Sequence, residues 1–146
     1  MKLNDTLPKF TLTNQEGEEV SSVSWVGNSP VLIYFYPKDF TPGCTREACG
    51  FRDHYEDFSD KGIKVVGISS DSNTSHQKFA QKHQLPFTLL SDPDGKVRKL
   101  FHVKSTLLGI LPGRETFLFD KEGKLTFKFR SISGDSHVKE ALKYIS

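Results

Sequence analysis

Hydrophobic residues gather into short runs along the chain, and their spacing predicts strands and helices in alternation. Three runs are rich in β-branched and aromatic residues, and they cover 31–36, 64–69 and 116–119. Runs of this kind are typical of strands that are buried on both faces of a parallel or mixed sheet. Helical spacing of apolar positions falls between or after these strands, over 42–58, 75–82, 97–101 and 136–145.

Turn residues add two antiparallel hairpins to this order. A turn at 14–17 separates 10–12 from the stretch up to Val20, and a turn at 120–123 separates the third strand from a strand over 124–129. Strands that alternate with helices predict a layered α/β fold, with a central mixed sheet flanked by helices and an N-terminal β-hairpin. A thioredoxin-like fold fits this order, as do other small α/β folds. A length of 146 residues suits one domain, which we expect over 1–146.

Composition narrows the possible function classes. A hydrophobic content of 36% and a charged content of 26% are ordinary for a globular protein, and a net charge of +2 does not predict a nucleic-acid partner. The sequence has no run of the roughly 20 apolar residues that a membrane span requires. It also lacks the apolar core of a secretory signal near Met1, so we expect a cytoplasmic location. In that reducing compartment, a pair of cysteines is more often catalytic or metal-binding than a structural disulfide.

The two cysteines follow the most hydrophobic predicted strand. Thr41 and then Pro42 predict a helix N-cap with proline at the first helical position, which makes Cys44 the third residue of the helix. The unpaired N–H groups of a first turn and the positive end of the helix dipole favour a thiolate, which is the nucleophilic form of cysteine. Gly43 has no side chain and leaves room for a small ligand close to the backbone.

The helical period separates Cys44 from Cys49. Apolar residues share the side of Cys44, namely Ala48, Phe51, Tyr55 and Phe58, whereas Arg46, Asp53 and Asp57 lie opposite and Cys49 lies on the polar flank. Five residues apart on an intact helix, the two Cα atoms would be roughly 8.7 Å apart, by helix geometry. A disulfide tolerates at most about 7 Å. A Cys44–Cys49 disulfide therefore requires the first turns to unwind, and Gly50 lowers the cost of that unwinding.

Other interpretations of these residues stay open at this point. A cysteine on an apolar helix face is often a small core residue. A dithiol–disulfide oxidoreductase would be expected to have Cys-x-x-Cys spacing, which is absent, whereas a thiol redox sensor needs only a reactive cysteine. The cysteines and the five histidines match no common zinc spacing. We expect those histidines at surface or capping positions, and they are His54, His76, His83, His102 and His137.

Several motifs together resemble the peroxiredoxins. The spacing Pro37-x-x-x-Thr41-x-x-Cys44 is similar to the active-site motif of that family, and 34–44 with 47–53 resembles its peroxiredoxin Q or bacterioferritin comigratory protein branch. Further along, 66–72 and 85–92 resemble the next two core strands of the family. The stretch 114–118 resembles the strand that bears its active-site arginine. The resemblance covers nearly the whole chain.

The resemblance implies a thioredoxin fold and a peroxidatic Cys44 that reduces hydroperoxides. It implies that Cys49 is the resolving cysteine, which forms an intramolecular disulfide with Cys44. We assign the stabilisation of the transition state to the Thr41 hydroxyl, the Arg114 guanidinium and the backbone N–H groups of Gly43 and Cys44.

Two neighbours complete the expected site. Pro37 is expected to limit water at the sulfur. Glu47, one turn beyond Cys44, is a candidate for fixing an arginine, with a solvated helix carboxylate as the alternative. An apolar stretch at 107–113 lies just ahead of Arg114. It is a candidate for the mouth of a pocket, for a dimer contact or for packing against its own domain.

By resemblance, thioredoxin is the expected reductant, with glutaredoxin as the second choice. No metal, haem or flavin cofactor is implied. We expect a monomer, or at most a weak dimer, because the chain has no third cysteine for the intersubunit disulfide of other family members.

Overall fold

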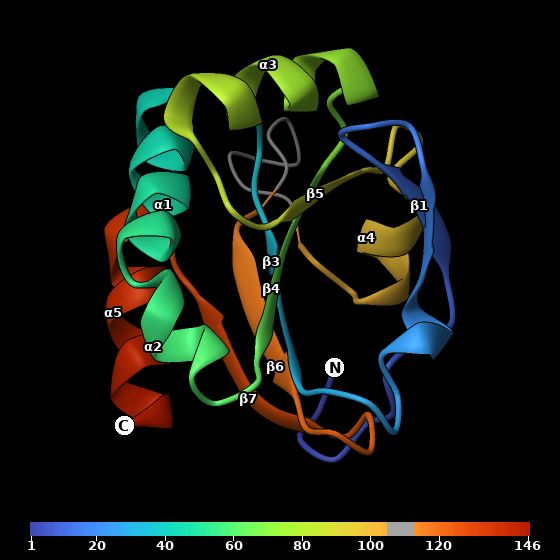
Figure 1. Cartoon of the computed structure of the whole chain (residues 1–146). Coiled ribbons are helices and arrows are strands. Elements are labelled where there is room, and N and C mark those ends of the chain that lie inside the picture. Colours follow the sequence, from blue (N-terminus) through green and yellow to red (C-terminus); the bar gives the residue numbers. More distant parts are fainter. Residues whose placement is uncertain (105–112) are drawn as a thin grey trace.

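The three hydrophobic runs form the centre of a mixed sheet in the computed structural model, which describes residues 1–104 and 113–146 (Figure 1). Within the described residues the sheet has seven strands in the order β2-β1-β5-β4-β3-β6-β7. Strands β3, β4 and β5 are parallel, whereas β1 and β6 join them antiparallel. The bounds are β1 Thr11–Asn14, β2 Glu19–Ser21, β3 Val31–Phe35, β4 Lys64–Ser69, β5 Thr88–Ser91, β6 Glu115–Phe119 and β7 Leu125–Arg130. The predicted fold class is confirmed.

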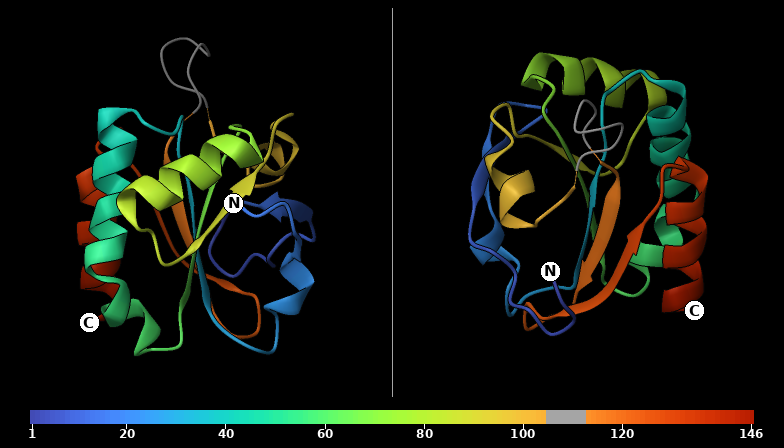
Figure 2. Two further views of the ribbon diagram at one scale, coloured as in Figure 1. Left: turned by 45° about the horizontal axis from the view of Figure 1, so that its top comes forward. Right: turned by 180° about the vertical axis from the view of Figure 1, so that it is seen from behind.

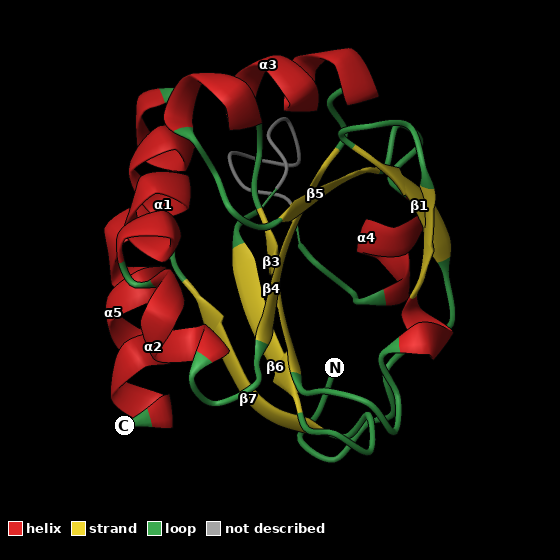
Figure 3. Cartoon of the chain, viewed as in Figure 1, coloured by secondary structure: helices red, strands yellow, loops and turns green. Residues whose placement is uncertain are grey.

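Alternate residues of β3 enter two separate cores, one on each face of the sheet. Leu32 and Tyr34 pack with the helices α1 (Pro42–Asp53), α2 (Tyr55–Ser59) and α5 (Gly134–Ile145), and with Phe79 of α3 (Asn73–His83). Ile33 and Phe35 pack with α4 (Lys96–Leu100) and with residues of the N-terminal segment. Figures 1 and 2 show these two layers, and Figure 3 separates helices from strands by colour. The run of β3 is unbroken because both of its faces are buried.

The helices follow the sequence prediction with one interruption. The expected helix over 42–58 is split, because His54 leaves helical backbone angles at φ −109° and ψ 17°. The bounds are α1 Pro42–Asp53, α2 Tyr55–Ser59, α3 Asn73–His83, α4 Lys96–Leu100 and α5 Gly134–Ile145. A short 3₁₀ turn, η1 Ser22–Ser24, precedes β3. Both predicted hairpins are present, as β1 with β2 and β6 with β7.

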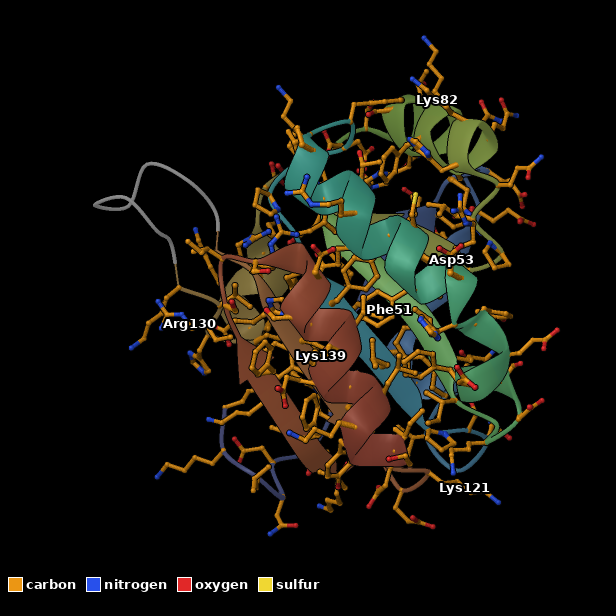
Figure 4. All side chains as sticks on the ribbon, turned by 90° about the vertical axis from the view of Figure 1, so that its left-hand side faces the viewer. Phe51, Asp53, Lys82, Lys121, Arg130 and Lys139 are labelled. Atoms are coloured by element: carbon orange, nitrogen blue, oxygen red, sulfur yellow. The ribbon has the colours of Figure 1, made fainter. Side chains whose placement is uncertain are left out.

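Helices α1 and α5 approach each other closely, and Figure 4 shows them side by side. A Cβ atom added to Gly50 of α1 would lie 2.9 Å from Cγ2 of Val138, and one added to Gly134 of α5 would collide with the carbonyl oxygen of Gly43. Gly50 was expected only to ease unwinding. Because a side chain at this position would displace Val138, Gly50 also permits the packing of the folded helix.

The apolar stretch 107–113 lies outside the described residues, except for Gly113. Its three proposed roles, as a pocket mouth, a dimer contact or packing against its own domain, therefore stay predictions. Among the residues that are described, no helix has the length and apolar character needed to cross a membrane.

Candidate active site

Cys44 lies at the carboxyl end of β3, in the first turn of α1. The helix begins at Pro42, so Cys44 is its third residue as predicted, and its side chain is buried with 1% exposure. Thr41 occupies the N-cap with extended backbone angles, but its side chain does not cap the helix. Its hydroxyl donates instead to the carbonyl oxygen of Lys38, at 2.8 Å. The hydroxyl hydrogen of Thr41 is therefore already used, and the oxygen of that group is left as an acceptor.

The side chain of Arg114 contacts the sulfur of Cys44 from the start of β6, the strand that pairs with β3. It directly precedes β6, and the pairing of Phe35 with Glu115 brings it to the end of β3. Its Nη2 donates to Sγ of Cys44 at 3.2 Å, and the residue is 8% exposed. A Cβ atom on Gly43 would lie 3.3 Å from that Nη2. The absence of a side chain at Gly43 thus leaves room for the guanidinium, a neighbour that was not foreseen from the sequence.

Glu47 holds the other side of the same guanidinium. Its Oε1 is paired with Nη1 of Arg114, and the carboxylate is fully buried. Of the two expectations for Glu47, the one that it fixes an arginine agrees with this contact, and the solvated carboxylate is wrong. One turn of helix separates Cys44 from Glu47, so both side chains reach Arg114 from the same face of α1.

Burial and charge act in opposite directions on this pair. Burial raises the pKa of Glu47 to about 8, although Arg114 pulls it downward. Burial alone would lower the pKa of Arg114, but the charges and hydrogen bonds of Glu47 and Cys44 raise it above its ordinary value. Arg114 therefore stays a cation beside the sulfur, whereas burial favours the protonated form of the Glu47 carboxyl group.

His137 of α5 lies behind Glu47, and the prediction of a surface or capping position is wrong for it. The residue is fully buried. Its Nε2 donates to the carbonyl oxygen of Ser131 at 2.8 Å, so its Nδ1 accepts from the Thr116 hydroxyl at 2.8 Å. Burial lowers the pKa of His137 to about 4, and Arg114 adds to that effect. The sequence held one signal for this burial, because His137 precedes the buried Ala141 by one helical turn.

His76 of α3 is the second histidine for which a surface or capping position is wrong. It is fully buried, and both of its ring nitrogens face oxygen acceptors. Nδ1 lies 2.7 Å from Oδ2 of Asp39, and Nε2 lies 3.1 Å from the carbonyl oxygen of Leu90. The pair ties the loop ahead of α1 to α3 and β5.

This tie is extended by further hydrogen bonds at Asp39. Its Oδ1 accepts from the Tyr36 hydroxyl at 2.6 Å, and its backbone N–H donates to Asp71 at 2.8 Å. The ligand-type atoms of Asp39, Asp71 and His76 lie within 4.8 Å of one another, as in a metal site. Each of these side chains is already engaged by protein hydrogen bonds, so we interpret the cluster as an anchor for the loop. The loop needs one, because Phe40 has a left-handed φ of 65°, which is strained for a residue other than glycine.

Cys49 lies apart from Cys44, on the flank of α1 that faces α3. Both cysteines are free thiols, and Cys49 is half-buried. Its Sγ lies 3.7 Å from Nδ1 of His83, a contact that sequence reasoning missed. Pro37 is partly exposed between β3 and the loop, and its shielding role stays a prediction. The structure thus gathers Cys44, Arg114 and Glu47, and it keeps Cys49 at a distance from them.

Known proteins resemble this chain in sequence and in structure. Residues 3–128 match the AhpC/TSA family. Peroxiredoxin Q of Sedum lineare, named as chloroplastic, is 52% identical over 141 residues, which are 96% of this chain and 75% of the relative. This chain spans only 64% of chloroplastic peroxiredoxin Q from Suaeda salsa, at 48% identity.

Two solved structures share the fold over nearly the whole of both chains. Peroxidoxin BcpB from Mycobacterium tuberculosis is 38% identical with a TM-score of 0.90, over 99% of this chain and 96% of that one. The bacterioferritin comigratory protein of Xanthomonas campestris is 31% identical with a TM-score of 0.86, over 97% of each chain, and its structures concern its alkyl peroxide reduction activity.

The burial of Glu47 generates a prediction about stability and pH. In the unfolded chain its carboxyl loses its proton near the ordinary pKa of 4.5, but in the folded protein only near pH 8. The folded state therefore binds more protons between these values, and Glu47 lowers the free energy of unfolding as pH rises, by up to about 1.4 kcal/mol per pH unit. Glu47→Gln removes this contribution, so urea unfolding from pH 5 to 8 should show a smaller decline than in the unsubstituted protein.

Exposed Glu56 of α2 provides the control for this experiment. Glu56→Gln should leave the decline of the parent protein unchanged. If Glu47→Gln and the parent protein gave parallel stability curves over this range, the raised pKa of Glu47 would be wrong.

Proposed function

The chain belongs to the AhpC/TSA family, in its peroxiredoxin Q branch, and is a thiol-dependent peroxidase; we propose that Cys44 is its peroxidatic cysteine and Cys49 its resolving cysteine. The observation that carries the proposal is the buried sulfur of Cys44 at the start of a helix, with Nη2 of Arg114 at 3.2 Å. A thiolate at this position gains from the cation and from the positive end of the helix dipole.

In the first step, the Cys44 thiolate attacks the terminal oxygen of a hydroperoxide. The S–O bond forms as the O–O bond breaks, and the leaving oxygen takes a proton to give water or an alcohol. Arg114 and the free N–H groups at the start of α1 face the negative charge that spreads over sulfur and the two oxygens. Since the Thr41 hydroxyl already donates to Lys38, its oxygen is the part of that group that is free to accept the hydrogen of the hydroperoxide.

In the second step, Cys49 attacks the sulfenic sulfur of Cys44. The S–S bond forms, the S–O bond breaks, and the hydroxide leaves as water with the proton of the Cys49 thiol. Helix geometry forbids this bond while α1 is intact. Resolution therefore follows a local unwinding of the α1 segment that carries Cys49.

An external dithiol then reduces the disulfide, and we propose thioredoxin for this task. Organic hydroperoxides join hydrogen peroxide as proposed substrates, supported by the alkyl peroxide reduction activity of the Xanthomonas campestris relative. A monomer and a cytoplasmic location stay predictions. The word chloroplastic in the names of the plant relatives describes those proteins.

Arg114→Lys tests the role of the guanidinium. Lysine keeps the charge but lacks the planar fork that contacts Glu47 and Cys44 at the same time. The second-order rate constant for hydrogen peroxide, measured by stopped flow, should fall about 10- to 100-fold, which corresponds to roughly 1.4 to 2.7 kcal/mol.

The matched control is Arg130→Lys, at the half-exposed arginine that ends β7 and is labelled in Figure 4. It should change the rate constant less than twofold. Equal rates for Arg114→Lys and the parent protein would remove Arg114 from the transition state.

The two cysteines are tested by NADPH oxidation coupled through thioredoxin and its reductase. Cys44→Ser should lose all peroxide-dependent turnover, because no nucleophile remains. Cys49→Ser should consume one equivalent of peroxide and then stop, because the sulfenic acid has no internal partner. Full thioredoxin-linked turnover by Cys49→Ser would contradict its resolving role. A dithiol–disulfide oxidoreductase or a redox sensor would show no rapid turnover with peroxide even in the parent protein.

A further inference from the structure

The resolving cysteine contacts α3 through the side chain of His83. Sγ of Cys49 lies 3.7 Å from Nδ1 of His83, within hydrogen-bond range for sulfur. His83 is the last residue of α3, and Gln84 ends that helix with a left-handed φ of 51°. Figure 4 shows this end of α3, marked by the neighbouring Lys82, beside α1.

Two contacts fix the position of His83. Its ring meets the fully buried ring of Phe79 edge-on, with centroids 5.1 Å apart. Its carbonyl oxygen accepts from Nη1 of Arg52 at 2.8 Å. Cys49 and Arg52 are neighbours on α1, so two contacts fasten the same turn of α1 to one residue of α3.

The ring of His83 is suited to accept a hydrogen from a thiol. Burial, with the cations Lys82 and Arg52, lowers its pKa below the ordinary 6.5. The ring is therefore neutral at pH 7.5. A neutral ring offers Nδ1 as an acceptor when the proton is on Nε2, and the thiol of Cys49 is the donor that faces it.

We propose that His83 is a positioning residue that clasps Cys49 in the folded helix and so sets the rate at which Cys49 reaches oxidised Cys44. The proposal rests on the function proposed above. Release of Cys49 must break its contact with His83 and displace the turn that Arg52 holds. The clasp stabilises the folded α1, in which Cys44 meets peroxide, and it slows the unimolecular step that forms the disulfide with loss of water.

A slower resolving step has a chemical consequence. The sulfenic acid of Cys44 is either resolved by Cys49 or oxidised by a second hydroperoxide to the sulfinic acid. The clasp therefore also determines how much peroxide the protein tolerates before its nucleophile is lost to overoxidation.

His83→Phe tests the clasp, because it keeps a flat ring against Phe79 and removes the nitrogen. Reduced protein is mixed with one equivalent of hydrogen peroxide, quenched with acid, alkylated and analysed by mass spectrometry. Peroxide consumption should keep its rate within twofold, whereas disulfide formation should accelerate about three- to tenfold, as the loss of one weak hydrogen bond from the folded state implies. The peroxide concentration that gives half sulfinic acid should rise by a similar factor.

The pH dependence separates the clasp from general loosening of the structure. Protonated His83 cannot accept from the thiol, so the ratio of the disulfide-formation rates of His83→Phe and the parent protein should shrink toward one as the pH is lowered through the titration of the His83 ring, which is followed by NMR in the parent protein. The charged groups facing the ring are Lys82 and Arg52. A ratio that stays constant while the ring titrates would indicate loosening only and would overturn the proposal.

Controls separate this proposal from the proposed function. Lys78→Gln, an exposed change on α3, should keep both rates of the parent protein. Arg52→Gln loosens the same turn from the other side and should accelerate disulfide formation even if His83→Phe does not fold. An unchanged or slower disulfide step in both variants overturns the clasp. Absence of peroxide consumption in every protein would instead contradict the role of Cys44.

Discussion

The site depends on one buried cation, the guanidinium of Arg114, which is held between the carboxyl group of Glu47 and the sulfur of Cys44. A buried charge without partners would be strongly destabilising, so each neighbour is fitted to it. Gly43 leaves the room that the guanidinium occupies. Glu47 shares a helix face with Cys44, and α5 closes the space behind the pair with His137, which stays neutral. The charge that assists the nucleophile is thus also what organises the packing of α1, β6 and α5.

The same helix has two incompatible tasks. Folded, α1 buries Ala48 and Phe51, presents the sulfur of Cys44 to Arg114 and keeps Cys49 on the opposite flank. The disulfide requires that this arrangement be given up locally. Three features lower the free-energy cost of unwinding. Helix α1 has only twelve residues, Gly50 is a weak helix former, and the strands of the sheet pair with one another independently of α1. The Asp39–His76 pair holds the preceding loop, so only the segment around the cysteines needs to move.

The pattern of apolar and polar residues predicted those features that depend on residues close together in the sequence. The strands at 31–36 and 64–69, the start of α1 and the inward side of Cys44 all follow from spacing within a few residues. The pattern alone did not give β5, which is four residues long and directly follows Pro86 and Phe87; it came only from the family resemblance. The buried states of His76 and His137 were missed because their partners are far away in sequence. Asp39 lies 37 residues from His76, and Thr116 lies 21 residues from His137. Likewise, the contact of Cys49 with His83 arises only when α3 is packed on α1.

Helix α1 must be intact when Cys44 meets peroxide and unwound when the disulfide has formed. Hydrogen–deuterium exchange of the 42–53 segment tests this change, compared between the reduced protein and the protein oxidised with one equivalent of peroxide. Protected amides are expected in the reduced form, and loss of that protection in the disulfide form. Strand β4 should stay protected in both, and Cys49→Ser should keep α1 protected after peroxide. A disulfide confirmed by mass spectrometry together with an equally protected α1 would show that the bond forms without unwinding of the helix.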